Sequence, residues 1–410
     1  MSDRGRLYFE KLGSTIHDAW RCEGFNGDAF ANIAERVLIE APPSEHVSFS
    51  DCVRFSFLDN PLPFQIDLKA PFGQPPLTVY WQHEFRIDLL FWVDSLLEIH
   101  EHAFSGAFHI VHGSSIHSEW TFELGARFGH HLVLGQLIPE KVELLRRGDT
   151  RIIRPGKRFI HSTYHLDRPS ISLVVRTNRE SGALPFFVYL RPGIAYAPEE
   201  ISVPMRRRSQ VLRMLSRSQQ SDELVEITSN FLNRCEDPLE VFYTLLETMG
   251  LVRTSQQREI LQTAAAMRHS TLVSEIRPAL DARFLDSALA AVRERVDTTD
   301  LRFFLATLSH SRDVIFELID AQYPGSNTVD RIGEWLLALS RCGILHLPSS
   351  ELHAQILPGL LALKSTRNIH HKLVTAHPSL DKQVIDDMRH ILLSHRLLAN
   401  LFAPSTGQTQ

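Results

Sequence analysis

The sequence predicts an α+β protein, with N-terminal helices, then a β-barrel or double-sheet jelly roll, then an all-α domain. Three observations lead to this prediction. Apolar residues recur at helical spacing in the first forty residues, and short runs rich in β-branched and aromatic residues follow to about residue 201. Amphipathic helical patterns fill the rest. Many short strands without intervening helices favour an antiparallel barrel or sandwich over a parallel sheet.

Residues 1–45 are expected to form helices that pack on the barrel. Between about residues 6 and 39 the pattern is mostly helical, and Asn26 or Asp28 could cap a helix. Pro42 and Pro43 end the pattern. The apolar positions that share one helical face are Phe30, Ile33, Ala34 and Val37.

Residues 46–203 are expected to form the β-domain. Gly, Pro, Asn and Asp separate short runs that are rich in Val, Ile, Phe, Tyr and Thr. Representative runs are residues 77–81, 85–92, 107–111, 151–154, 170–176 and 186–190.

Residues 204–404 are expected to be all-α, followed by a polar tail at 405–410. Val211, Leu212 and Leu215 share a helical face, and further helical patterns cover 284–296, 301–318, 329–339, 350–363 and 380–401. These apolar faces would support a bundle on the barrel, a lid, a homodimer interface or a site for a protein partner. The sequence leaves these alternatives open.

Composition excludes several classes of function. The 43 basic and 48 acidic residues give a formal charge of −5, which is no footprint for nucleic acid or an anionic membrane. The four cysteines form no C-x-x-C pair, and the apolar runs are too short to cross a bilayer. We therefore expect a soluble, cytoplasmic protein.

Two histidines, His100 and His102, have the spacing of metal ligands. Alternate residues of a strand point to the same side, so a His-x-His pair directs two imidazoles at one point. His161 follows on a second β segment, after Pro155-Gly156. Three neutral imidazoles suit Fe, Zn, Cu or Ni and leave coordination positions open. We predict one metal site made of these three histidines.

These segments resemble the two motifs of the cupin superfamily. The first motif matches His100, His102 and Gly113, and the second matches Gly148, Pro155-Gly156 and His161 with looser spacing. Cupins usually carry a glutamate ligand beyond the pair, where this chain has Gly106 or Ala107. A cupin with three histidines and no glutamate resembles the thiol (cysteine) dioxygenases. This resemblance covers about residues 80–180 and implies a jelly-roll barrel with a non-haem Fe(II) centre.

The chain departs from the thiol dioxygenase pattern around that centre. Ser172 matches the serine of the family's Ser-His-Tyr relay, but Val174 and Arg176 stand where its histidine and tyrosine would be. Ala107 replaces a cysteine that some members cross-link to the tyrosine. No match is found for the arginine that usually holds the amino-acid carboxylate. The resemblance therefore carries over the metal site but not the thiol substrate.

Strand alternation suggests other substrate-binding residues. If Trp92 faces the cavity, Asp88 and Arg86 do too. An arginine fork binds a carboxylate through two parallel hydrogen bonds, so Arg86 and Arg176 are candidate anchors for an anionic substrate, with Trp92 beside them. The alternatives are that Arg86 pairs with Asp88 or lies on a solvated face.

Three residues are candidate catalytic groups: Ser172, Arg176 and His165. Arg176 would hold the acidic group of the substrate, and Ser172 and His165 could tune bound oxygen or substrate.

Further polar residues near the ligands have open roles. His109 shares a strand parity with Ala107, so it is either a fourth ligand, a donor behind the ligands, or a hydrogen-bonded barrel histidine. Glu98 could orient a ligand imidazole, whereas Glu101 is expected to be solvated. No spacing singles out His112, His117, His130, His131 or His165.

The leading hypothesis is an Fe(II)-dependent oxygenase that acts on a small, anionic substrate with O2. One alternative is a non-catalytic cupin sensor or scaffold whose helical domain binds a partner. Another is a Zn, Ni or Mn cupin that catalyses isomerisation or hydrolysis.

Overall fold

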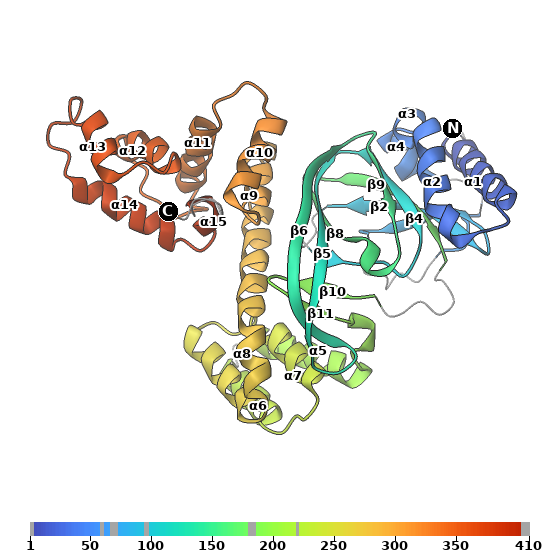
Figure 1. Cartoon of the computed structure of the whole chain (residues 1–410), viewed down its shortest axis with the longest axis horizontal. Helices are drawn as coiled ribbons and strands as arrows, with labels where there is room; N and C mark the ends of the chain where they lie inside the picture. The colour runs from blue at the N-terminus through green and yellow to red at the C-terminus, as the bar shows by residue number, and fades with distance from the viewer. Residues whose placement is uncertain are drawn as a thin grey trace. The chain divides into compact units, whose positions relative to one another are not determined.

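The structure, a computed structural model, describes residues 4–57, 61–65, 73–93, 98–178, 186–218 and 221–402. The chain forms two compact units, Met1–Phe284 and Leu285–Gln410. All strands of the described residues lie in the first unit, and the second is helical (Figure 1). The expected α+β class, with leading helices, a double-sheet β-domain and a helical C-terminal half, is confirmed.

The strands of the described residues form two antiparallel sheets. The first has the order β1 (Pro76–Trp81), β2 (Phe85–Trp92), β9 (Ser170–Thr177), β4 (Gly106–His112) and β7 (Thr150–Ile153). The second is a closed ring with the order β10 (Val188–Leu190), β11 (Ile194–Tyr196), β6 (Leu132–Arg146), β5 (Ser114–Arg127), β8 (Ile160–His165) and β3 (Ile99–His100). Pairing of β3 with β10 closes this ring.

Among the residues that the structure describes, four helices precede the β-domain: α1 (Arg4–Cys22), α2 (Gly27–Glu40), α3 (Pro43–His46) and α4 (Phe49–Phe55). The predicted cap is Asn26, whose side chain accepts a hydrogen bond from the Asp28 backbone N–H. Leu173 and Val175 of β9 belong to one apolar core with the buried residues of α1, α2 and α4. Val174, between them, belongs to a different core on the face that points to the ring. The helices therefore cover the outer face of the five-stranded sheet.

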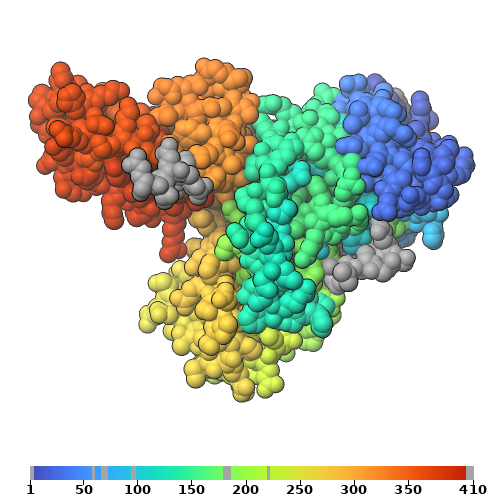
Figure 2. Space-filling view, in the orientation of Figure 1, coloured from blue at the N-terminus to red at the C-terminus, as the bar shows by residue number. Residues whose placement is uncertain are grey.

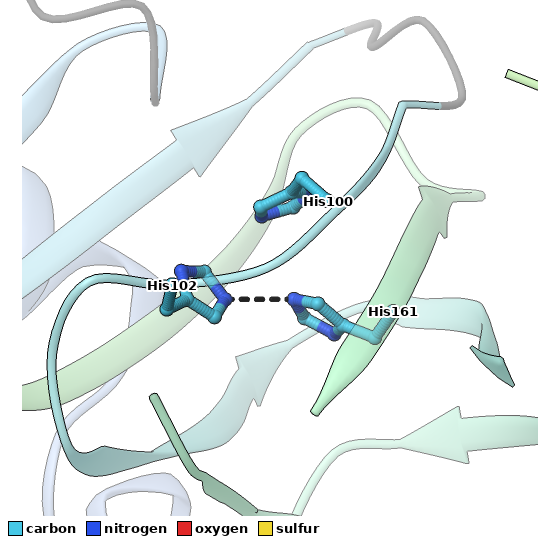
Figure 3. A group of neighbouring side chains, drawn as sticks. All are labelled: His100, His102 and His161. Atoms are coloured by element: carbon cyan, nitrogen blue, oxygen red, sulfur yellow. Dashed lines mark hydrogen bonds between the residues drawn. The ribbon is translucent and has the colours of Figure 1, made fainter. Parts of the chain in front are cut away.

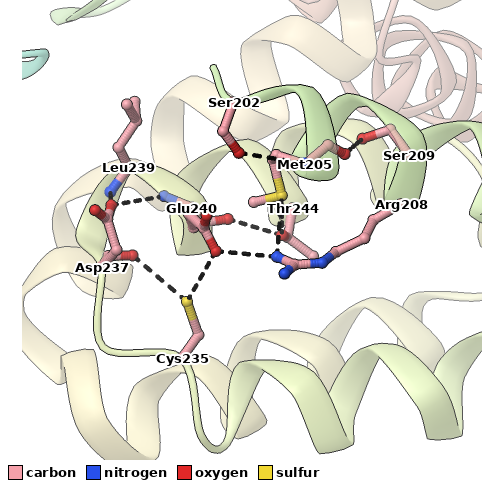
Figure 4. A network of polar contacts seen from close by, with 9 residues as sticks. All are labelled: Ser202, Met205, Arg208, Ser209, Cys235, Asp237, Leu239, Glu240 and Thr244. Atoms are coloured by element: carbon pink, nitrogen blue, oxygen red, sulfur yellow. Dashed lines mark hydrogen bonds and ion pairs between the residues drawn. The ribbon is translucent and has the colours of Figure 1, made fainter. Parts of the chain in front are cut away.

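Helices also cover the outer face of the ring. Leu132 and Leu134 of β6 pack with buried residues of α5 (Val203–Arg217), α6 (Ser221–Leu232), α7 (Pro238–Thr248) and α8 (Ser255–Glu294), while Val133 packs in a separate core with Tyr189. Figure 4 shows polar contacts that join α5 to α7: Arg208 pairs with Glu240 at 3.0 Å, and Asp237 caps α7. Backbone angles at His269 break the regular geometry of α8.

The second unit continues with α9 (Thr299–Thr307), α10 (Arg312–Gln322), α11 (Thr328–Arg341), α12 (Glu351–Leu361), α13 (Thr366–Leu373), α14 (Lys382–Ser394) and α15 (Ala399–Phe402). Trp335 of α11 packs on Phe304 of α9, with ring centroids 5.3 Å apart. The pattern over 301–318 corresponds to two helices, because the chain turns before Ser311, the N-cap residue of α10. The predicted domain bounds at 45 and 203 mark changes of secondary structure and stay predictions, and the tail at 405–410 lies outside the described residues.

The longest strands, β5 and β6, pair as a hairpin whose tip is exposed. The second half of β5 lies at the surface, teal in Figure 2, whereas Leu132 to Leu134 of β6 are buried. In the described residues, no helix combines the length and apolar character that a membrane span requires.

Candidate metal centre

The three predicted ligands lie together inside the barrel. His100 in β3 is the register partner of His161 at the start of β8, and His102 follows β3. Each ring offers one nitrogen, and these three nitrogens lie within 4.8 Å of one another. The ring centroids are 4.7 to 5.0 Å apart. Figure 3 shows His102 Nε2 and His161 Nε2 directed toward each other at 2.9 Å. In the described part of the chain, this group contains no carboxylate.

The turn at Pro155 and Gly156 in the second sequence motif contacts the backbone of His102 in the first. Pro155 forms a parallel bridge with His102, and the Gly156 N–H donates to the His102 carbonyl at 2.8 Å. Gly156 has φ +64°, in the region that favours glycine. This turn leads into β8 and therefore carries His161 back to the pair.

Apolar walls surround the imidazoles. The rings of Phe104 and Phe159 lie 4.6 Å from His102 and 4.4 Å from His161, and Phe108 lies 6.0 Å from His161. Burial lowers the pKa of His100, and burial together with the neighbouring imidazoles lowers those of His102 and His161 well below the usual histidine value. The rings are thus kept neutral, which is the form that binds a metal.

The separation of the ring nitrogens fits a shared ion. Two imidazole nitrogens bound at about 2.0–2.1 Å, and at right angles around one ion, lie about 3 Å apart. The 2.9 Å between His102 Nε2 and His161 Nε2 matches that spacing. His100 Nδ1 lies 3.3 Å from the Glu98 carbonyl oxygen, and we assign Nε2 as its candidate ligand atom. His100, His102 and His161 could therefore hold one metal ion.

A fourth histidine, His117 of β5, lies behind His161 and was not singled out by its spacing. Its Nε2 is 3.1 Å from His161 Nδ1, and its Nδ1 is 3.2 Å from Glu143 Oε1. Arg151 donates two hydrogen bonds to the same carboxylate, at 2.8 and 2.6 Å. Only the pairing of β5 with β8 and β6 brings these residues together, so local sequence carries no signal for the contact.

The arginines proposed as substrate anchors share one buried carboxylate. Asp88 has 1% exposure, and its Oδ2 accepts from Arg86 Nε at 3.1 Å and from Arg176 Nε at 2.8 Å. The alternative that Arg86 pairs with Asp88 is therefore present in the structure, extended by Arg176. Arg176 also lies over the Phe104 ring, 5.0 Å from its centroid, and its charge acts on the nearby His102.

Trp92, Ser172 and His165 form a separate group. Trp92 Nε1 donates to Ser172 Oγ at 3.0 Å, and the Trp92 ring stacks on His165 with centroids 4.5 Å apart. His165 lies four residues after His161 on β8, a separation of about 13 Å at ordinary strand rise. That rise separates the two backbones, although the His165 side chain still acts electrostatically on His161. The expected roles of Ser172 and His165 therefore stay predictions.

His109 is not a ligand. Phe108 and Ile110 face the interior of the β-domain, so His109 faces the N-terminal helices. There its ring nitrogens lie 2.8 Å from Thr150 Oγ1 and 3.0 Å from Ser44 Oγ. The fourth-ligand alternative is wrong, because the parity that it assumed for β4 is reversed. The alternative of a hydrogen-bonded barrel histidine is confirmed.

The glutamates that flank His100 differ from expectation. The Glu98 carboxylate is 3.5 Å from Arg283, and the contact to His100 comes from the Glu98 backbone. Glu101 is buried instead of solvated: its carboxylate accepts from the Tyr189 hydroxyl at 2.6 Å and the Phe187 N–H at 3.2 Å. Burial raises the pKa of Glu101. The carboxylate points away from the three imidazoles, as strand alternation requires.

No protein-family model matches the chain, and no curated protein sequence matches it. Among solved structures, it is similar to the DMSP lyase DddQ from Ruegeria pomeroyi DSS-3, at 16% identity and TM-score 0.20, over 30% of this chain and 59% of that chain. It is also similar to a recombinant oxalate oxidase in complex with glycolate, at 15% identity and TM-score 0.21, over 38% and 74%. The match spans about three fifths of the first structure. At these scores the matches carry no functional argument, and the resemblance to thiol dioxygenases stays a prediction.

Proposed function

We propose that the first unit is a cupin-type metal enzyme, in which His100, His102 and His161 bind Fe(II) for the oxygenation of a small anionic substrate. One observation carries the proposal: three neutral imidazoles converge beside the rings of Phe104 and Phe159, with two Nε2 atoms 2.9 Å apart. A facial set of three nitrogen ligands leaves positions for a substrate and O2. A ferrous ion there would supply these positions and the electrons for oxygen activation.

The residues around the histidines would bind and orient the substrate. Arg86, Arg176 and Asp88 together carry one excess positive charge, which favours an anion near Arg176. The rings of Phe104 and Phe159 would exclude water and strengthen that attraction.

The Trp92, Ser172 and His165 group would contact a longer substrate. His165 lies four residues beyond His161 on the same strand, so a substrate that contacts both groups would extend along β8. A small acid would contact Arg176 alone.

Metal quantification and oxygen uptake test this proposal. The purified chain is loaded anaerobically with Fe(II), and O2 consumption is measured against thiols, amino acids and keto acids. We expect one bound iron and substrate-dependent uptake, with both lost in His100→Ala. His112→Ala is the control, because His112 is exposed and outside the histidine group.

The metal that the chain binds distinguishes the alternative functions. A chain that binds no metal would overturn the enzyme proposal and favour a scaffold, tested by partner binding with all three histidines replaced. A chain that binds Zn, Ni or Mn in preference to iron, without oxygen uptake, would favour an isomerase or hydrolase.

A further inference from the structure

The residues behind His161 form a linear series that ends on a fixed anion. His161 Nδ1 is 3.1 Å from His117 Nε2, and His117 Nδ1 is 3.2 Å from Glu143 Oε1. His117 is fully buried, and its two ring nitrogens are both engaged in these contacts. Glu143 is held by Arg151 through two hydrogen bonds and by Lys141 at 3.0 Å.

The direction of each hydrogen bond follows from the carboxylate. Burial acts to raise the pKa of Glu143, but hydrogen bonds from Arg151, His117 and Lys141 lower it overall, well below its usual range. Glu143 therefore has no proton to donate, and His117 Nδ1–H must donate to it. In the neutral form of His117, which carries one N–H, Nε2 is then an acceptor and receives the Nδ1–H of His161. His161 Nε2 is then left with a lone pair directed toward His102 Nε2, 2.9 Å away.

We propose that His117 and Glu143 are positioning residues that fix the tautomer and ring orientation of His161, so that its Nε2 is preset as a metal ligand. A carboxylate commonly holds a ligand histidine directly. In this chain a second imidazole stands between them and extends the series across the wall of the barrel, from β8 through β5 to β6. The inference rests on the proposed metal site, but its first test requires no metal.

The first test is the tautomer of His161 in the wild-type, metal-free chain. Long-range proton–nitrogen NMR spectra of protein with ¹⁵N-labelled histidine identify which ring nitrogen carries the proton. We expect the proton of His161 on Nδ1 and a bare Nε2. A proton on Nε2 would overturn the proposal, and this measurement does not depend on the folding of any variant.

The second test is Co(II) affinity, measured by the visible absorption of the bound ion. His117→Leu removes the acceptor at similar volume, and we expect binding about 10- to 100-fold weaker. His117→Gln places an amide oxygen near the former Nε2, where it can accept from His161, so affinity should stay within a few-fold of wild type. His109→Leu is the matched control, because His109 is equally buried in the same β-domain but faces the helices.

The outcomes separate the two proposals. Co(II) binding by His117→Leu as tight as that of wild type would overturn the positioning role, and so would an equal loss in His109→Leu or His117→Gln. Failure of wild-type protein to bind Co(II) would contradict the metal site itself. In that case the NMR result still decides whether His117 and Glu143 orient His161.

Discussion

At the scale of single residues, buried histidines make the first unit sensitive to acid. His109 has no exposed surface, and burial lowers its pKa to about 4. Because the unfolded chain takes up this proton near the ordinary histidine pKa of about 6.5, the unfolded state binds more protons between these values. The contribution of His109 to stability therefore falls as the pH drops from about 6.5 to about 4.

We predict that His109→Gln reduces this acid sensitivity. Glutamine does not titrate, so the loss of unfolding free energy between pH 7 and pH 4.5 should be smaller than in wild type, by on the order of 2 kcal/mol. Urea unfolding followed by tryptophan fluorescence measures it, in a Trp335→Phe background, because the other tryptophans all lie in the first unit. Equal acid sensitivity in the two chains would contradict the prediction.

The metal ligands could be predicted from single residues, and their supporting residues could not. The spacing of His100 and His102 is enough to predict a pair of ligands, because alternate side chains of a strand point to the same side. His117 and Glu143 reach His161 only through two strand pairings, which no local pattern specifies. The sequence does not predict which face of β4 carries His109 for a related reason: both faces of that strand are buried, so neither is marked by polar residues.

At the scale of elements, α1 packs on β1 through a glycine. A Cβ atom built on Gly13 would lie 2.4 Å from the ring of Tyr80, far inside van der Waals contact. We predict that Gly13→Ala destabilises the first unit by about 1–3 kcal/mol, despite the better helix propensity of alanine.

Gly5 of the same helix is the matched control for Gly13. Its added Cβ would have its nearest neighbour at 3.7 Å, so Gly5→Ala should be neutral or slightly stabilising. Thermal unfolding of both variants decides the matter. Similar melting temperatures for the two would show that α1 shifts freely on the sheet.

The strands differ in how clearly the sequence predicts them. The runs at 77–81, 85–92 and 170–176 correspond to β1, β2 and β9, where one face packs on the helices along the whole strand. The sequence pattern does not predict the full length of the long strands β5 and β6. The first half of β5 is buried on both faces and its second half is exposed, so no single two-residue period extends along it.

At the scale of the whole molecule, the chain divides into two units, and only the first contains the three histidines. We predict that metal binding stabilises the first unit alone, by about 2.7 kcal/mol at a free metal concentration 100 times Kd. Trp335 reports on the second unit. The unfolding curve of that unit is obtained by subtracting the fluorescence of Trp335→Phe from that of wild type. A shift of that transition with Co(II) would contradict independent unfolding.

The overall architecture was more predictable than its partition into units. The change from strand to helix after Tyr196 follows the sequence pattern, since hydrophobic periodicity changes there from two to about 3.6. Helices α5 to α7, and α8 as far as Phe284, nevertheless belong to the same unit as the barrel, because they bury the outward-facing apolar residues of β6, β10 and β11. Periodicity identifies an apolar face but does not identify what packs on it.

The short strand β3 gives the ring a seam. It spans two residues, whereas β5 and β6 span 14 and 15, so the ring is closed there by few backbone hydrogen bonds. His100 lies in that seam, paired with Val188 on one side and His161 on the other. An ion held by His100 and His161 would therefore link β3 to β8 where few backbone hydrogen bonds join them. Metal binding would then also stabilise the closed form of the barrel.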